Sequence, residues 1–391
     1  MTALDSTADA IVVGLGAAGA ATLLALSRQG MRCIGIDRFH PPHDQGSSHG
    51  ESRITRLAVG EGPAYAPLVR RSHELWRQLE SESGETLLLQ TGGLVMGPRD
   101  GAAQHHGKGD FVRRTIAVAE ENAIPHEVLD ADELGRRFPQ LSLAGNELAY
   151  FEPSAGLVFP ERCIAMQLQL ARQHGAALRL GERVRGIESK AGIVTVTTEH
   201  GRLNAPQVVV AAGPWTSTLA RGPLAELAAV YRQTLHWFTA DDPEAYRPGR
   251  FPVFIWMHGE GEEDYLYGFP SLPGSSSVKV ASERYSAPVQ AETVERQVSP
   301  AESAAIYERH VAGRLRGVTA ACERAAACLY TVTPDSGFIV DAVSELEGVT
   351  FVTACSGHGF KHSAALGEQV AQRLVGKTRE LETFCLSRFH A

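Results

Sequence analysis

The sequence predicts an α/β protein of two domains, one built on a parallel sheet and one, of α+β type, built on a mixed sheet. At 391 residues the chain is too long for one simple hydrophobic core. Residues 10–38 read as strand, helix and strand in direct succession, which is typical of a parallel sheet. Residues 225–285 carry short strands joined by tight turns, which indicate the second sheet.

The strand–helix–strand unit has a glycine pattern typical of dinucleotide binding. An apolar strand leads into Gly14-x-Gly16-x-x-Gly19, an Ala- and Leu-rich helix follows, and a second strand ends at Asp37. The glycines allow a tight turn, backbone approach to a pyrophosphate and close helix–strand packing, and the helix N-terminus offers free N–H groups. Asp37 can accept hydrogen bonds from ribose hydroxyls, which favours FAD or NAD over NADP. The motif alone does not separate FAD from NAD.

Later segments indicate that this Rossmann-like domain is discontinuous. Apolar residues at helical spacing predict helices within residues 68–79 and 161–173, and residues 179–216 alternate as strands. The predicted assignment gives residues 1–87, 154–224 and 326–391 to the dinucleotide-binding domain, and residues 88–153 and 225–325 to a substrate domain.

Three local patterns give further expectations. Residues 290–315 predict a helix by their periodicity, broken at Pro300, and residues 107–110 (GKGD) predict a loop tip. Residues 334–337 (PDSG) lie between two apolar runs and predict the turn of a hairpin, with Cys328 near its mouth. Taken alone, an unpaired cysteine at that place would be a small core residue.

Composition excludes several functional classes. The formal net charge of −8 argues against a nucleic-acid binder. No apolar run approaches the roughly 20 residues of a membrane-spanning helix, and the polar N-terminus does not resemble a signal peptide. The six cysteines form neither a CxxC motif nor a zinc-spaced cluster, so we expect reduced thiols, no metal site and a cytoplasmic protein.

Four segments together resemble the family of monomeric sarcosine oxidase, N-methyltryptophan oxidase, pipecolate oxidase and the fructosyl-amino-acid oxidases. They are GSSHGESRITRLAVGEG (46–62), YGFPSLPGSSSVK (267–279), CLYTVTPDSGFIVD (328–341) and CSGHGFKHSAALGE (355–368). The resemblance runs from residue 10 to residue 389. It implies an FAD-binding domain of the glutathione-reductase and D-amino-acid-oxidase type, joined to a mixed-sheet catalytic domain. It also implies a monomer that oxidises a secondary α-amino acid and reduces O₂ to H₂O₂.

The resemblance also implies how FAD is held. Cys328 matches the cysteine that forms a thioether with the flavin 8α-methyl group (8α-S-cysteinyl FAD), a reaction that needs a nucleophilic sulfur at the flavin edge. The N–H groups of the SGHGFK segment would face the part of the flavin that becomes negative on reduction. The FAD contacts that we expect are Gly14, Gly16, Gly19, Asp37, Arg38, Ser47, His49, Arg53, Val184, Gly213, Trp215, Cys328, Gly357, His358, Gly359, Phe360 and Lys361.

The same resemblance assigns roles toward the substrate and O₂. Arg56 and Lys361 would bind the substrate carboxylate, for which a guanidinium and an ammonium are suited. Tyr267 and Tyr330 would line the substrate cavity, and Lys279 would activate O₂ as a fixed cation. The expected catalytic residues are Lys279, Arg53, His49 and Glu283. Glu61 would pair with an arginine, and Arg53 and Arg56 would share one face if their segment were helical.

Glu283 departs from the sarcosine branch of the family. That branch has a histidine four residues after the oxygen-activating lysine, whereas an ungapped match places Glu283 there. Fructosyl-amino-acid oxidases have a glutamate at this position, so an oxidase of that type is the alternative to a sarcosine- or pipecolate-type oxidase. An amine dehydrogenase with another electron acceptor and a non-catalytic flavin-binding protein are the remaining alternatives.

Overall fold

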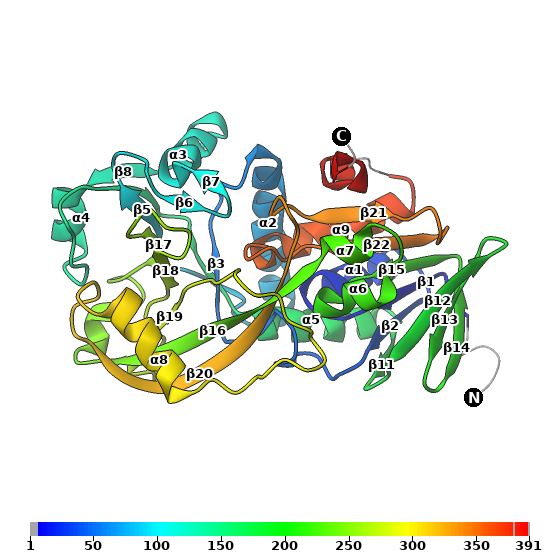
Figure 1. Cartoon of the computed structure of the whole chain (residues 1–391). Helices are drawn as coiled ribbons and strands as arrows, with labels where there is room; N and C mark the ends of the chain where they lie inside the picture. Colours follow the sequence, from blue (N-terminus) through cyan, green and yellow to red (C-terminus); the bar gives the residue numbers. More distant parts are fainter. Residues whose placement is uncertain (1–6, 378–379, 390–391) are drawn as a thin grey trace.

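A six-stranded sheet forms one half of the computed structural model, which describes residues 7–377 and 380–389 (Figure 1). Its order is β11 (Ala177–Leu180), β2 (Cys33–Asp37), β1 (Ala10–Val13), β15 (Gln207–Val210), β22 (Val349–Thr353) and β21 (Ile339–Ala342). All neighbouring strands are parallel except β21, which runs antiparallel to β22. All four residues of β1 are buried, and its sequence is apolar throughout. This is typical of a parallel strand that is covered on both faces. The predicted parallel sheet is confirmed.

Different layers cover the two faces of this sheet. On one face lie α1 (Ala17–Arg28), α5 (Pro160–Gln173) and α9 (Ser363–Leu374), with α2 (Ala66–Ser83) packed on α9. Val12 belongs to the core cluster on this side. On the other face lies an antiparallel sheet of β12 (Val184–Lys190), β13 (Ile193–Thr198) and β14 (Gly201–Ala205). Ile11 and Val13 pack in the cluster on that side, because alternate residues of a strand point to opposite faces.

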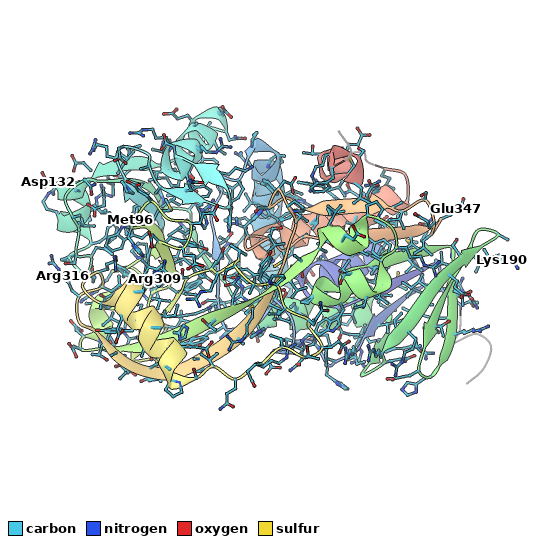
Figure 2. All side chains as sticks on the ribbon, viewed as in Figure 1. Met96, Asp132, Lys190, Arg309, Arg316 and Glu347 are labelled. Carbon is cyan, nitrogen blue, oxygen red and sulfur yellow. The ribbon has the colours of Figure 1, made fainter. Side chains whose placement is uncertain are left out.

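An eight-stranded mixed sheet forms the other half, as expected. Its order is β20 (Val318–Val332), β16 (Ala229–Ala240), β19 (Ser277–Ala281), β18 (Tyr265–Gly268), β17 (Val253–Met257), β5 (Gly93–Pro98), β9 (Glu147–Glu152) and β8 (Glu127–Asp130). Among these strands, only β17 and β5 pair in parallel. Helices α3 (Phe111–Glu121) and α4 (Ala131–Arg137) pack against its β9 side, and α8 (Pro300–Ile306) packs against β20. Figure 2 places Asp132 and Arg316 at this end of the molecule and Lys190 and Glu347 at the opposite end.

Short elements lie between the two large sheets. A three-stranded sheet contains β3 (Arg53–Thr55), β10 (Gly156–Val158) and β4 (Leu88–Gln90), and β6 (Gln104–His105) and β7 (Lys108–Gly109) form a hairpin. Short helices α6 (Thr216–Leu219) and α7 (Leu224–Leu227) follow β15. In the described part of the chain no helix is long and apolar enough to cross a membrane. The domain boundaries at residues 87, 153, 224 and 325 stay a prediction.

Two local predictions are wrong. The apolar runs on either side of residues 334–337 do not form a hairpin, because β20 pairs with β16 in the mixed sheet and β21 pairs with β22 in the parallel sheet. The helix predicted over residues 290–315 begins only at Pro300, where Ser299 and Glu302 form a capping box. Proline occupies the first helical turn, where its missing N–H has no intrahelical partner to lose, so it starts this helix instead of breaking it.

The loop tip predicted at residues 107–110 is shifted. Lys108 and Gly109 belong to β7, and the turn of the hairpin is made by His106 and Gly107, both with positive φ. Arg53 and Arg56 also do not share a helix face, because Arg53 opens the strand β3 and Arg56 follows it.

Candidate active site

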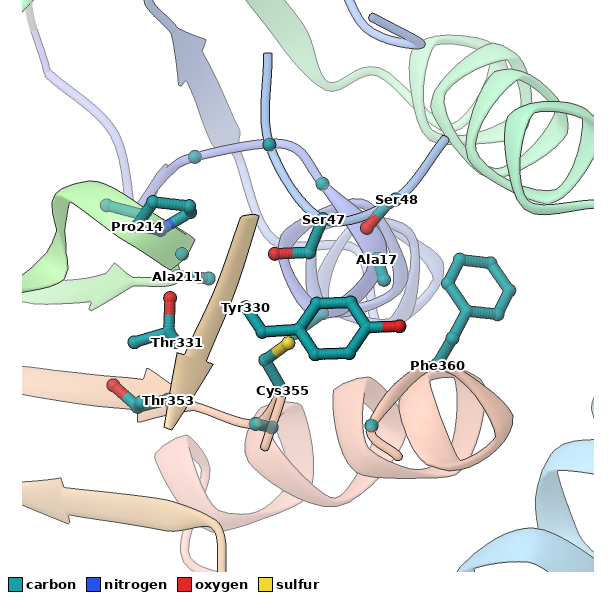
Figure 3. A pocket seen from close by; sticks show the side chains of 18 of the residues that line it. Ala17, Ser47, Ser48, Ala211, Pro214, Tyr330, Thr331, Thr353, Cys355 and Phe360 are labelled. Atoms are coloured by element: carbon teal, nitrogen blue, oxygen red, sulfur yellow. The ribbon is translucent and has the colours of Figure 1, made fainter. Parts of the chain in front are cut away.

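A cavity of about 410 Å³ begins at the carboxyl ends of the parallel strands and reaches the mixed sheet (Figure 3). The loops after β1, β2 and β15 line one part of it, and Ile255, Tyr267 and Tyr330 of the mixed sheet line another. Crevices at the carboxyl ends of parallel strands are where open α/β sheets bind ligands.

Most of the predicted site residues line this cavity. They are Gly14, Gly16, Asp37, Arg38, Ser47, Arg53, Arg56, Val184, Gly213, Trp215, Tyr267, Glu283, Tyr330, Gly357, His358, Gly359, Phe360 and Lys361. Gly19, His49, Lys279 and Cys328 are buried behind the cavity wall. At Gly19 a Cβ atom would lie 1.8 Å from the Gly14 carbonyl oxygen, so this glycine allows α1 to pack against the glycine-rich turn.

The nucleotide end of the cavity has the tight glycine turn that dinucleotide binding requires. Gly14 has φ +87°, and a Cβ atom there would lie 2.4 Å from the Ala211 carbonyl oxygen. The Asp37 carboxylate accepts hydrogen bonds from the backbone N–H groups of Leu15 (2.7 Å) and Phe39 (2.8 Å), so it joins the turn to the end of β2. The buried hydroxyl of Thr353, which also lines the cavity, has no hydrogen-bond partner among the described residues. A polar ligand would supply that partner, because buried hydroxyls are normally hydrogen-bonded.

Glu292 is an exposed residue that lines the same end of the cavity. Its carboxylate lies 2.7 Å from Nη1 of Arg38 and 2.9 Å from Nη2 of Arg183, and all three residues line the cavity. Sequence reasoning missed Glu292 because it placed this residue in the predicted helix over 290–315. Nothing in the local sequence indicates a pairing across more than 250 residues.

Cys328 lies beside a guanidinium group. It sits on β20, opposite Gln233 of β16, and its Sγ is 3.5 Å from Nη2 of Arg53 and 3.4 Å from the Ser47 carbonyl oxygen. Burial raises the pKa of the Cys328 thiol to about 11, although Arg53 acts in the opposite direction. Ser47, Tyr330 and Cys355, whose thiol does line the cavity, converge on one part of the wall (Figure 3). A cation next to a thiol stabilises the thiolate, which is the reactive form of cysteine.

Lys279 is held among carbonyl oxygens and aromatic rings. Its Nζ donates to the carbonyl oxygens of Gly50 (2.5 Å) and Ser52 (2.8 Å). It also lies 4.3 Å from the centre of the Phe269 ring and 5.4 Å from that of Trp237, its cross-strand neighbour. These contacts favour the ammonium form, whereas burial, reinforced by Arg53, lowers the pKa of Lys279 well below its usual value.

His49 is buried in the same region, and its Nε2 has no hydrogen-bond partner in the described part of the chain. Burial and the Arg53 charge lower the pKa of His49 to about 4, so this imidazole is neutral at pH 7.

Arg56, Glu61 and Lys361 form a buried charged group on the cavity wall. Nη2 of Arg56 lies 3.3 Å from Glu61 Oε2, which confirms that Glu61 pairs with an arginine, and Nζ of Lys361 lies 3.9 Å from Glu61 Oε1. Nε of Arg56 has no hydrogen-bond partner within residues 7–377 and 380–389. Burial lowers the pKa of Lys361 to about 8 although Glu61 opposes the shift. Two cations share one internal carboxylate, so this wall can accept a further anion.

Glu283 occupies the cavity together with a histidine that sequence reasoning missed. Glu283 Oε2 accepts hydrogen bonds from Nε2 of His106 (3.0 Å) and from the hydroxyl of Tyr285. Nδ1 of His106 faces Glu61 Oε1 at 3.4 Å. A Cβ atom on Gly357 would lie 2.7 Å from Nε2 of His106, so the backbone of the SGHGFK segment packs directly against this group. The only sequence signal for His106 was the pair of histidines before a glycine turn.

The geometry combines a dinucleotide cradle with buried cations at one continuous cavity. The phenolic oxygens of Tyr267 and Tyr330 lie 3.0 Å apart on the mixed-sheet wall. A small anionic molecule could therefore lie between this wall and a cofactor bound along the parallel sheet. The arrangement suits oxidation of a small carboxylic acid by a bound flavin.

Comparisons with known proteins agree with this interpretation. The family model described as FAD dependent oxidoreductase (DAO) matches residues 9–373. Monomeric sarcosine oxidase of Bacillus sp. (strain NS-129) is 34% identical over 384 residues, which cover 97% of this chain and 96% of the relative. N-methyl-L-tryptophan oxidase of Salmonella typhi is 33% identical over 387 residues, which cover 97% and 99%.

A solved structure shows the same fold. NikD, described as an unusual amino acid oxidase essential for nikkomycin biosynthesis, superposes with a TM-score of 0.81 over 96% of this chain and 95% of its own, at 23% identity. The glycine-rich cradle, the cavity and the full-length similarity lead to one conclusion: this chain belongs to the DAO family of FAD-dependent oxidoreductases.

Proposed function

We propose that this enzyme oxidises the C–N bond of a secondary α-amino acid of the sarcosine, N-methyl amino acid or pipecolate type. FAD, when bound, supplies the two-electron oxidation of the amine to an imine and the reduction of O₂ to H₂O₂. Water then hydrolyses the imine. The names of the relatives from Bacillus and Salmonella support an N-methyl amino acid as the substrate class.

The observation that carries this proposal is the buried pair of Arg56 and Lys361 in the same cavity as the dinucleotide cradle. Arg56 has an unused Nε–H, and Lys361 donates one hydrogen bond, to the His358 carbonyl oxygen at 2.9 Å. Both side chains can therefore donate to a substrate carboxylate without breaking the contacts that hold them. Fixing the carboxylate orients the carbon next to nitrogen toward the cofactor.

Two finer assignments belong to the same proposal. Cys328 would hold FAD through an 8α-S-cysteinyl thioether, with Arg53 stabilising the sulfur as an anion. Lys279 would act on O₂ through its positive charge from behind the wall, and Arg53 and the neutral His49 would lie beside the cofactor. We also propose that the enzyme works as a monomer in the cytoplasm, as the name of the Bacillus relative suggests for its assembly.

Glu283 favours a second candidate, an oxidase of fructosyl-amino acids. It is buried in the cavity and ionised, because His106 and its other hydrogen-bond donors outweigh burial and lower its pKa to about 2. A fixed carboxylate can accept hydrogen bonds from sugar hydroxyls. Both hydrogen bonds from His106 and Tyr285 use Oε2, so a hydroxyl-bearing substrate would have to share this carboxylate with them.

A panel of amino acids added without oxygen tests the proposal. Loss of the oxidised-flavin absorbance with sarcosine, N-methyltryptophan or pipecolate supports the main candidate, and loss with fructosyl-glycine alone supports the second. Admitting O₂ should then yield one H₂O₂ for each substrate molecule oxidised, whereas substrate oxidation without H₂O₂ would indicate a dehydrogenase. A flavin that no amino acid reduces would refute the proposal.

A further inference from the structure

The hairpin of β6 and β7 inserts one side chain into the substrate end of the cavity. His106 lies at its turn with φ +50°, and its side chain is only 4% exposed although its backbone lies near the surface. The preceding His105 anchors the hairpin, with its ring edge-on to Phe111 at 4.7 Å and to Tyr265 at 4.6 Å between centroids. His106 is therefore held in the cavity by packing as well as by charge.

His106 is the cation that two buried carboxylates share. Nε2 lies 3.0 Å from Glu283 and Nδ1 lies 3.4 Å from Glu61. Burial alone would lower the pKa of His106, but Glu283 and Glu61 outweigh burial and raise that pKa to about 9. Without this partner Glu283 would be a buried carboxylate with only neutral donors, which is a costly arrangement unless a cation binds to it.

Five charged side chains surround the substrate end of the cavity. The cations are Arg56, Lys361 and His106, and the anions are Glu61 and Glu283. Other titratable groups facing the cluster stay neutral at pH 7, because burial lowers the pKa of His105 and His358 and raises that of Tyr265 and Tyr285. The cluster therefore carries one net positive charge, which a monoanion neutralises and a zwitterion does not.

We propose that His106 is a specificity-determining residue. Because its positive charge pairs with Glu283 and Glu61, the site binds an α-amino acid as a monoanion with an uncharged nitrogen and excludes the form with a cationic nitrogen. The inference rests on the proposed function and deepens it. The uncharged amine is also the form whose lone pair can assist loss of hydride from the adjacent carbon. His106 thus selects the reactive form of the substrate at the binding step.

Two ligands that lack an oxidisable amine test this inference. Methoxyacetate is a monoanion of the size of sarcosine, and glycine betaine has the same carboxylate with a permanently cationic nitrogen. Calorimetric titration of the holoenzyme at pH 7 gives the ratio of their dissociation constants. In H106Q the unpaired Glu283 should favour betaine, so the preference for methoxyacetate should fall by on the order of tenfold or more relative to wild type. The two ligands differ in size, but this difference affects the ratio of their dissociation constants in the same way in the variant and in the wild type.

Three further variants make the test specific for charge. H106K retains a cation and should keep the wild-type ratio, whereas E283Q leaves His106 without its main partner and should raise the preference for methoxyacetate. The H106Q/E283Q double variant should return toward wild type. H200Q is the control, since it changes an exposed histidine that does not line the cavity and should leave the ratio unchanged.

The outcomes separate this inference from the proposed function. An unchanged ratio in folded H106Q, or a lower preference for methoxyacetate in E283Q, overturns the inference. If H106Q does not fold, the E283Q and H106K ratios decide in the same way. Reduction of the wild-type flavin by an amino acid supports the proposed function whatever the ratios are. A wild-type protein that binds neither ligand and is reduced by no amino acid would refute both.

Discussion

Replacing Gly357 by alanine should destabilise the protein through the substrate site itself. Gly357 has φ +79°, and a Cβ atom would lie 2.7 Å from Nε2 of His106, 2.9 Å from the hydroxyl of Tyr285 and 3.1 Å from Oε1 of Glu283. Contacts under 3.0 Å force one partner to move, and here every partner is held by the ion pairs and hydrogen bonds of a buried cluster.

The magnitude follows from two contributions. A left-handed backbone conformation costs alanine about 1–2 kcal/mol relative to glycine. Overpacking a buried cluster adds about 1–3 kcal/mol. We therefore expect Gly357→Ala to lower the free energy of unfolding by about 2–5 kcal/mol. Gly376 is the matched control, because it has φ +72° and a Cβ atom there would meet no other described segment within 4 Å, so Gly376→Ala should lose only the backbone contribution.

Urea unfolding of the two variants and the wild type measures the difference. Calorimetric titration with methoxyacetate should also show weaker binding in Gly357→Ala and unchanged binding in Gly376→Ala. Equal losses of stability in both variants, with equal ligand affinity, would refute the inference that Gly357 supports the His106–Glu283 cluster.

Three other predictions concern single residues. Burial lowers the pKa of Lys361 to about 8, and only the ammonium form attracts a carboxylate. The affinity for methoxyacetate should therefore be constant below that pH and fall by up to tenfold per pH unit above it. In Lys361→Met this change of slope should be absent, and its persistence would assign it to another group. Lys279→Met should slow flavin reoxidation by O₂ by roughly 10²-fold or more in stopped-flow measurements while changing substrate reduction little; equal slowing of both steps would contradict its assigned role. In Cys328→Ser the FAD should be released by acid precipitation, whereas the wild-type chain should retain a mass adduct of FAD; free FAD from both would refute the thioether.

The charged residues of the cavity act as one system. Glu61 lies between Arg56 and Lys361 on one side and His106 on the other, and the two cations and His106 keep the pKa of Glu61 well below its usual value despite burial. Changing any member therefore alters the charge that the others present to a ligand. Variants in this group should be compared as pairs, because the effects of residues in direct contact are not additive.

Much of the candidate site could be predicted from sequence because its parts are local. The turn from Gly14 to Gly19 follows from residue types that permit tight backbone approach, and the structure shows that approach directly. Asp37 lies at the end of β2, where the strand–helix–strand pattern placed it. The resemblance indicated most residues of the cavity wall, since short contiguous motifs preserve their local geometry.

What failed depended on contacts between distant segments. The runs around residues 334–337 have the pattern of a hairpin, but each pairs with a strand of a different sheet. Residues 290–299 have helical periodicity, yet Glu292 lines the cavity and pairs with Arg38 and Arg183.

The sequence by itself determined the cofactor class, the α/β architecture and the two cations suited to a carboxylate. These depend on backbone geometry and charge that are written in short motifs. Only the tertiary structure decided that Lys279 and Cys328 lie behind the wall and that His106 reaches Glu61 and Glu283. The physical reason is that a buried charge is stable only beside its partner, and that partner comes from whichever segment the packing of the two sheets brings near.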